Sequence, residues 1–197
     1  RRICCHRTLR GDFLAIKIFI DQGHNPYGHN TGATSQGVNE QDITYNVGLY
    51  LYDMLNSNSN FEARLSRPEE NTVLGTSNAT SLRARVDMAN TWPADYFISI
   101  HANSNVNPNI NGTEVYVYRA YTEAYYLAEY VLNGIVDLVG TKNNGVRTNP
   151  ALYVLRRTKM PAILVELAYM SNFEDLERLV DEQYTFAEGI YDGLLNY

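Results

Sequence analysis

The sequence is poor in cysteine, in basic residues and in long apolar runs, and each shortage argues against a class of protein. Its only cysteines are the neighbours Cys4 and Cys5, which provide no disulfide framework. No apolar run approaches the roughly 18 residues that cross a membrane, so we expect no transmembrane segment. A net charge of −6 argues against nucleic acid as a partner, because nucleic-acid-binding domains usually carry a basic face.

The start of the chain differs from the remainder. Residues 1–12 include several basic side chains, but no apolar segment follows them, so we expect no signal peptide there. We interpret residues 1–14 as a disordered or vector-derived segment and residues 15–197 as one folded domain. Composition alone leaves the cellular compartment open.

The body of the chain reads as a single α/β domain. Hydrophobic residues make up 45% and charged residues 19%, which is enough to bury a full core. Apolar runs typical of strands alternate with helical periodicities, without internal repeats, and this alternation predicts a mostly parallel sheet. The predicted strands lie at residues 15–20, 61–66, 96–101, 113–118, 152–155 and in the run ending at 167. The predicted helices lie at residues 43–55, 81–90 (capped by Thr80 or Ser81), 121–138, 173–180 and 182–195, with 140–150 as a loop.

Histidines follow two of the predicted strands. Tyr96 to Ile100 is apolar and β-prone and ends in His101, at the position where open α/β sheets bind ligands. His24 comes just after the first strand, at the start of a long loop rich in Gly, Asn and Pro. A hydrogen-bonded core histidine is an equally good interpretation of His101 taken alone, and His29 reads as a solvated loop residue.

Two glutamates occupy unusual positions. Glu40 lies at the start of the helix that follows the long loop, where the helix dipole alone explains an acidic residue. Glu166 follows four apolar residues in a predicted strand, where a carboxylate is costly unless it has a partner.

These groups converge if the strands are parallel neighbours. Two imidazoles and one carboxylate form a ligand set of catalytic zinc, with the fourth position left for water. A second carboxylate outside that set would act as a general base toward the water. The sequence contains no His-Glu-x-x-His, which weakens the commonest metalloprotease patterns.

Several motifs in order resemble the zinc-dependent N-acetylmuramoyl-L-alanine amidases, the amidase-3 family of bacterial cell-wall hydrolases. The resemblance covers residues 16–195. Its motifs are Asp21-Gln22-Gly23-His24, Asn39-Glu40, Ser81-Leu82-Arg83-Ala84-Arg85-Val86, residues 94–103, Gly112-Thr113-Glu114-Val115-Tyr116, Gly145-Val146-Arg147, Met160-Pro161-Ala162 and Leu164-Val165-Glu166-Leu167.

The resemblance implies a fold, a site and a reaction. It implies a three-layer α/β domain with about six strands flanked by helices on both faces. It makes His24, Glu40 and His101 the ligands of one Zn²⁺ and Glu166 the catalytic carboxylate. The bond it implies joins N-acetylmuramic acid to the L-alanine of the peptidoglycan stem peptide, so the enzyme would act outside the cytoplasm, at the cell wall, periplasm or spore envelope.

Substrate contacts are a separate prediction. Asn103 and Asn172 lie just beyond strand ends and could contact peptide or sugar. Arg67, Arg85 and Arg156 could pair with a stem-peptide carboxylate, although a structural salt bridge is the other interpretation of each arginine.

Two other functions stay open at this stage. One is a zinc peptidase of related architecture that cuts a peptide bond within the stem, and the other is a catalytically weak domain that binds wall peptide. No wall-binding repeats accompany the domain, so we expect a regulatory or targeting protein partner or flanking regions to direct it. Some members of the resembled family carry a long inhibitory helix that residues 118–122 leave no room for, so we expect an open site.

Overall fold

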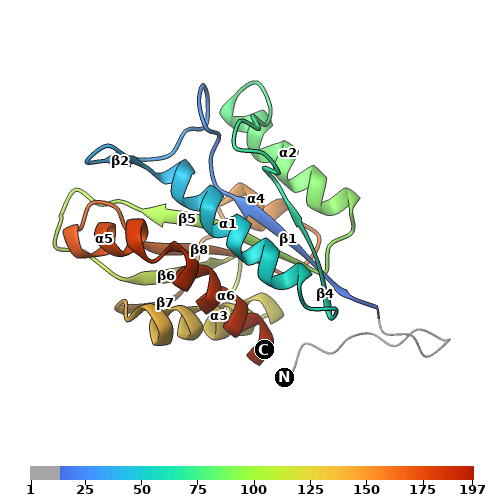
Figure 1. Cartoon of the computed structure of the whole chain (residues 1–197). Coiled ribbons are helices and arrows are strands. Elements are labelled where there is room, and N and C mark those ends of the chain that lie inside the picture. The colour runs from blue at the N-terminus through green and yellow to red at the C-terminus, as the bar shows by residue number, and fades with distance from the viewer. Residues whose placement is uncertain (1–13) are drawn as a thin grey trace.

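A computed structural model describes residues 14–197, so the expectation for residues 1–14 falls almost entirely outside the described part of the chain. Six strands form one sheet in the order β4-β1-β5-β8-β6-β7, with helices on both faces (Figure 1). The predicted three-layer, mostly parallel α/β domain is confirmed. The strands of this sheet are β1 (Ile16–Gln22), β4 (Phe61–Leu65), β5 (Tyr96–Asn103), β6 (Thr113–Val117), β7 (Asn143–Thr148) and β8 (Ala162–Tyr169). The helices are α1 (Glu40–Asn56), α2 (Asn78–Thr91), α3 (Glu123–Val139), α4 (Tyr153–Arg157), α5 (Phe173–Asp181) and α6 (Gln183–Asn196).

Alternation along the strands divides the core into two layers. On β5, Ile98 and Ile100 belong to the core cluster formed with α1, α3 and α6, while Phe97 belongs to the cluster formed with α2 and α4. These two sets of helices cover opposite faces of the sheet (Figure 1). Both faces of the central strands are therefore buried, which is why these strands read as nearly continuous apolar runs. None of the helices within residues 14–197 is long and apolar enough to cross a bilayer.

Strand direction decides which residues meet at the functional edge. Strands β4, β1, β5 and β8 run parallel to their neighbours, and His101 on β5 lies in register with Glu166 on β8. Strand β6 runs antiparallel to β8 and places Glu114 in register with Glu166 on its other side. His101, Glu166 and Glu114 thus form a row across three strands at one edge of the sheet.

Two predicted elements are wrong. Residues 152–155 were predicted as a strand, but Leu152 caps the short helix α4 and residues 153–155 lie within it, because four apolar-rich residues have no periodicity that distinguishes strand from helix. Residues 140–150 were predicted as a loop but contain β7, an edge strand whose Asn and Gly residues lack the apolar signal of a buried strand.

The turns around the helices refine the remaining expectations. Helix α2 begins three residues earlier than predicted, with Ser77 as its cap in a capping box with Thr80. Only residues 118–122 connect β6 to α3, so this connection holds no additional helix, as expected. A short hairpin of β2 (Thr34–Ser35) and β3 (Val38–Asn39) forms the end of the long loop after β1 and leads directly into α1.

Candidate functional site

Three donor atoms from three separate elements meet at the carboxyl edge of β1 and β5. The Oε1 atom of Glu40 lies 3.0 Å from Nε2 of His24 and 3.1 Å from Nδ1 of His101. The two ring nitrogens are themselves 3.1 Å apart. Within residues 14–197 this is the one group of His, Cys, Asp and Glu side chains with the spacing to hold a metal ion.

A buried arginine fixes the backbone around His24 through its hydrogen bonds. His24 follows β1 with φ 69°, in the left-handed region that non-glycine residues rarely adopt. Nη2 of Arg85 donates to the His24 carbonyl oxygen at 2.6 Å, and Nη1 forms a 2.7 Å ion pair with buried Asp21. The arginine therefore stabilises an otherwise unfavourable backbone conformation that turns the imidazole toward Glu40.

Two glycines leave room for these side chains. A Cβ atom on Gly23 would lie 2.6 Å from Cε1 of His101 and 2.8 Å from its Nδ1. A Cβ atom on Gly32 would lie 2.8 Å from Oε2 of Glu40 and 3.0 Å from Cδ2 of His24. Sequence reasoning missed the role of both glycines, although Gly23 stands in the motif around His24.

Glu40 is the buried member of the group and its two oxygens have different roles. Oε2 accepts the Ala33 N–H at 2.9 Å, while Oε1 accepts the Ala102 N–H at 3.1 Å and faces the histidines. Burial pushes the pKa of Glu40 upward, but the hydrogen bonds and charges of His101 and His24 outweigh it and hold the pKa below the ordinary value. The carboxylate is thus ionised at neutral pH.

The donor set fits a zinc ion. Donor atoms 3.0–3.1 Å apart can all reach one ion at the roughly 2.0–2.1 Å typical of Zn–N and Zn–O bonds. Nδ1 of His24 lies 3.3 Å from the Asn30 carbonyl oxygen, and a proton on Nδ1 leaves the Nε2 lone pair facing the cluster. The histidine side chains are 19% and 20% exposed, so the cluster is open to solvent on one side.

Glu166 lies beside this cluster with one carboxylate oxygen unpartnered. Its Oε2 atom is buried and has no hydrogen-bond partner in the described structure. Burial, together with the nearby charges of Glu40 and Glu114, raises the pKa of Glu166 to about 8. A carboxyl group with a raised pKa in a cleft is typical of a general acid or base.

A cavity of about 170 Å³ opens next to His24 and His101. Its far wall is apolar and comes from Leu82 of α2, from Leu164 and from the segment around α4. The site therefore combines an open metal-binding cluster, a carboxylate and an adjacent apolar wall, as ligand sites commonly do.

The residues predicted to contact substrate have varied surroundings. The Asn103 amide donates to Glu114 at 2.7 Å, at the site. Asn172 caps α5 by accepting the Asp175 N–H, and its amide donates to the Pro108 carbonyl oxygen. Arg156 is exposed on α4, where its guanidinium lies 5.9 Å from the Tyr153 ring centre. Substrate contact by Asn103, Asn172 and Arg156 stays a prediction.

The two remaining arginine candidates and His29 have structural partners. Arg85 holds His24 and Asp21, and fully buried Arg67 donates to the carbonyl oxygens of Gln41 and Glu70. The predicted structural salt bridge is present for Arg85, with Asp21, whereas Arg67 is held by carbonyl oxygens and not by a salt bridge. His29 lies outside the donor cluster, with Nε2 3.1 Å from the Leu74 carbonyl oxygen, so it is tied to a neighbouring loop and only partly solvated.

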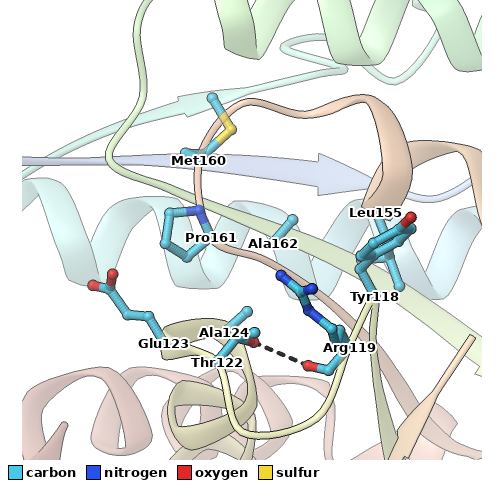
Figure 2. Close-up of a pocket in the computed structure, with 9 residues that line it drawn as sticks. All are labelled: Tyr118, Arg119, Thr122, Glu123, Ala124, Leu155, Met160, Pro161 and Ala162. Atoms are coloured by element: carbon cyan, nitrogen blue, oxygen red, sulfur yellow. Dashed lines mark hydrogen bonds between the residues drawn. The ribbon is translucent and has the colours of Figure 1, made fainter. Parts of the chain in front are cut away.

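A second cavity, of about 190 Å³, lies at the opposite edge of the sheet (Figure 2). It is lined by Met160 and Pro161 before β8 and by Tyr118 and Arg119 after β6, which ends at that edge because it runs antiparallel to β8. The lining contains one cation and no histidine, so its chemistry differs from that of the donor cluster.

Comparison with known sequences finds relatives over nearly the whole chain. A sequence model described as N-acetylmuramoyl-L-alanine amidase matches residues 18–196. The amidase LytC of Bacillus subtilis is 33% identical over 195 residues, covering 96% of this chain and 37% of LytC. The amidase CwlM of Bacillus licheniformis is 36% identical over 185 residues, covering 91% of this chain and 67% of CwlM. The chain thus spans little more than a third of LytC.

Comparison with solved structures gives the same relationship for the whole domain. The catalytic domain of the amidase CwlV from Bacillus (Paenibacillus) polymyxa var. colistinus is 32% identical, with a TM-score of 0.81. That match covers 92% of this chain and 97% of the solved one. An amidase from Clostridium difficile 630 is 29% identical with a TM-score of 0.82, covering 93% and 96% respectively.

Proposed function

Because the chain belongs to the N-acetylmuramoyl-L-alanine amidase family, we propose that it hydrolyses the amide bond between N-acetylmuramic acid and the L-alanine of the peptidoglycan stem peptide. The observation that carries the proposal is the juxtaposition of an open His-Glu-His cluster with a buried glutamate that has an unpartnered oxygen. The first group suits a hydrolytic metal and the second suits the base that such hydrolysis needs.

In this proposal His24, Glu40 and His101 hold one zinc ion through Nε2, Oε1 and Nδ1. When bound, zinc supplies a Lewis acid that makes water more acidic and polarises the scissile carbonyl. The backbone N–H groups of Ala33 and Ala102 keep Glu40 in one orientation, and Arg85 keeps the His24 backbone in place. These contacts would hold the three ligands in an arrangement that suits one metal ion.

Glu166 moves the proton. It accepts a proton from the water that attacks the carbonyl, and the protonated carboxyl group then delivers that proton to the departing alanine amine. Its register opposite His101 across β5 and β8 supports this role.

The substrate implies the location. Peptidoglycan lies outside the cytoplasmic membrane, so the enzyme acts at the cell wall, the periplasm or the spore envelope. A protein partner or flanking regions would direct it to a particular part of that wall.

The test pairs metal analysis with product analysis. Protein purified without added metal should contain about one zinc per chain, and purified peptidoglycan should yield intact stem peptide with a free alanine amine by mass spectrometry. Chelation should abolish the release, and restored zinc should recover it. His101→Ala should lose zinc, whereas His29→Ala, a matched histidine outside the cluster, should keep it.

The other outcomes contradict the proposal in different ways. Fragments cut within the stem peptide would show a zinc peptidase instead of an amidase. Zinc binding and wall binding without cleavage would show a binding domain. Normal zinc content in His101→Ala would overturn the ligand assignment itself.

A further inference from the structure

We propose that Arg147, held in place by the buried carboxylate of Glu114, binds a carboxylate of the stem peptide on the leaving side of the scissile amide. The inference rests on the proposed function and deepens it by naming a specificity-determining residue. It starts from a group of side chains next to Glu166 that the zinc chemistry does not use.

Sheet register places Arg147 on the face that carries the catalytic residues, two residues along the strands from the level of Glu114 and Glu166. Glu114 lies in register with Glu166, and Arg147 on β7 lies in register with Tyr116 on β6, two residues from Glu114. Side chains two residues apart on a strand share a face, so Glu114, Tyr116 and Arg147 all project from the face that carries Glu166 and His101. From that position the Arg147 side chain extends along the face to Glu114. Glu114 lies nearer than the Arg147 backbone to the carboxyl ends of β5 and β8, where the donor cluster is found.

Glu114 is a fixed anchor. Its side chain is 2% exposed, and its Oε1 accepts hydrogen bonds from the Asn103 amide at 2.7 Å, the Tyr116 hydroxyl at 2.9 Å and the Tyr169 hydroxyl at 3.1 Å. Burial and interaction with Glu114 raise the pKa of Tyr116 and of Tyr169 to about 12, so both phenols stay protonated and remain donors. These bonds hold the other oxygen, Oε2, toward Arg147.

Arg147 uses one edge of its guanidinium for this anchor and presents the rest to solvent. Nε lies 2.8 Å from Oε2 of Glu114 in an ion pair whose geometry is not that of a hydrogen bond, and the Arg147 side chain is 51% exposed. Its terminal Nη1 and Nη2 groups have no protein partner among residues 14–197. Two such groups form the fork that binds a carboxylate through two parallel hydrogen bonds. An arginine serving only to neutralise Glu114 has no need of this exposed, oriented fork.

An anionic substrate needs a cation that offsets the carboxylates at this edge of the sheet. Glu40 and Glu114 place negative charge there, which would repel a carboxylate that had no such partner. Arg67 and Arg85 are buried and bonded to the protein, so neither can reach substrate. Arg147 is paired with Glu114 of this row through Nε, and its two terminal nitrogens remain open.

The reach matches a carboxylate close to the cut bond. Neighbouring strands are about 4.8 Å apart, so Glu114 on β6 lies roughly 10 Å from the His101 strand. Two extended residues span about 7 Å, and an ion pair adds about 3 Å. A carboxylate on the second residue of the leaving peptide therefore reaches Arg147 while the scissile amide lies at the histidines.

The experiment compares two substrates that differ by one charge. Zinc-loaded enzyme is given matched muramoyl dipeptides whose second residue carries either a free carboxylate or a carboxamide. Arg147→Gln should lower kcat/KM for the free acid by about 10- to 100-fold, mainly through KM, and change the carboxamide by less than threefold. Arg147→Lys, which keeps the charge but not the fork, should fall between. Arg64→Gln, on the opposite edge strand β4, should leave both unchanged.

Other results overturn the inference separately from the proposed function. An equal loss on both substrates would give Arg147 a structural role, and no loss on either would exclude it from binding. Circular dichroism and zinc content confirm that each variant is folded and loaded. If the wild type cuts neither substrate, the proposed function fails, but calorimetric binding of the free dipeptide to wild type and Arg147→Gln still decides the carboxylate site. Equal affinities there would contradict it.

Discussion

The two faces of the central strands differ in polarity, although successive residues of the same strands contribute to both. On one face Ile98 and Ile100 of β5 are completely buried against α1, α3 and α6. On the other face the same strand carries Ser99, which donates to Asp21, and then His101, which faces Glu40. One face is a continuous apolar layer, and the other becomes polar as the strands approach their carboxyl ends.

The contrast separates stability from chemistry. Burial of each isoleucine side chain contributes about 1.5–3 kcal/mol, and that layer lies behind the site and not within it. The polar face places several ionisable groups close together, each of which needs a partner or a shifted pKa. A substitution on one face should therefore change stability while leaving the chemistry intact, and a substitution on the other should do the reverse.

The largest expected effect is on the polar face. Glu166→Gln keeps the shape of the side chain but cannot accept a proton, so kcat for release of the stem peptide should fall by about 10²- to 10⁴-fold. Zinc content should stay at the wild-type level because Glu166 is outside the donor cluster. Single-turnover cleavage with matched metal analysis measures both, and a kcat within tenfold of wild type would remove Glu166 from the proposed mechanism.

The apolar face should respond in the opposite way. Ile98→Ala leaves a cavity behind the site and should lower the free energy of unfolding by about 2–5 kcal/mol. The folded fraction should retain its zinc and a kcat within about threefold, measured at a temperature well below the midpoint of unfolding. A loss of zinc without a loss of stability would show that the two faces are not separable.

Burial also explains which secondary-structure elements sequence reasoning identified and which it missed. Nearly continuous apolar runs identified β1, β5 and β8, because burial on both sides selects apolar residues at most positions. Alternation identified β4 and β6. Strand β7 escaped because an exposed edge needs no such pattern, and α4 was mistaken for a strand because its apolar run is too short to reveal a period.

Sequence reasoning found the candidate residues whose ionisable side chains suggest a chemical role. It did not find the residues that matter because of the space around them. His24, His101 and Glu166 stand out as ionisable groups at strand ends, and the motif resemblance added Glu40. Gly32 has no side chain that could suggest a chemical role. Its contribution is the space that a Cβ atom would take from Glu40 and His24. Glu114 and Arg147 stood in recognised motifs, but only the structure shows that Glu114 lies opposite Glu166 and that Arg147 pairs with Glu114.

The pH dependence of stability tests the polar face without any substrate. In zinc-depleted protein the pKa of Glu166 is about 8 against an ordinary value of 4.5, so the folded state holds this proton more tightly than the unfolded state. The free energy of unfolding should consequently fall as pH rises from 5.5 to 8, by about 3 kcal/mol. Asp21 and Glu40, whose pKa values are lowered, are ionised throughout this window and add no slope there. Urea unfolding measures the slope, and Glu166→Gln should flatten it; an unchanged slope would assign it to other groups.

The smallest expected effect is that of replacing Gly32, a residue that neither holds the metal nor packs in the hydrophobic core. Gly32→Ala would place a Cβ atom 2.6 Å from Cβ of Glu40 and 2.8 Å from its Oε2, so the carboxylate must shift against the histidines. Displacing one ligand should weaken zinc binding by about 10- to 100-fold, as changes to groups that orient metal ligands typically do. Competition with a chromogenic chelator measures the affinity.

Gly37→Ala is the matched control for that substitution, because it separates crowding from backbone strain. Gly37 lies in the same loop at φ +81°, and a Cβ there would meet no atom within 4 Å. Its replacement should cost about 1 kcal/mol of stability through strain while leaving zinc affinity unchanged. If both variants bind zinc like the wild type, the loop adjusts to the added Cβ atom without moving Glu40. Arg85 and the backbone N–H groups around Glu40 would then be what orients the cluster. If both bind it weakly, the conformation of the whole loop, more than the space beside Glu40, sets the geometry of the donor atoms.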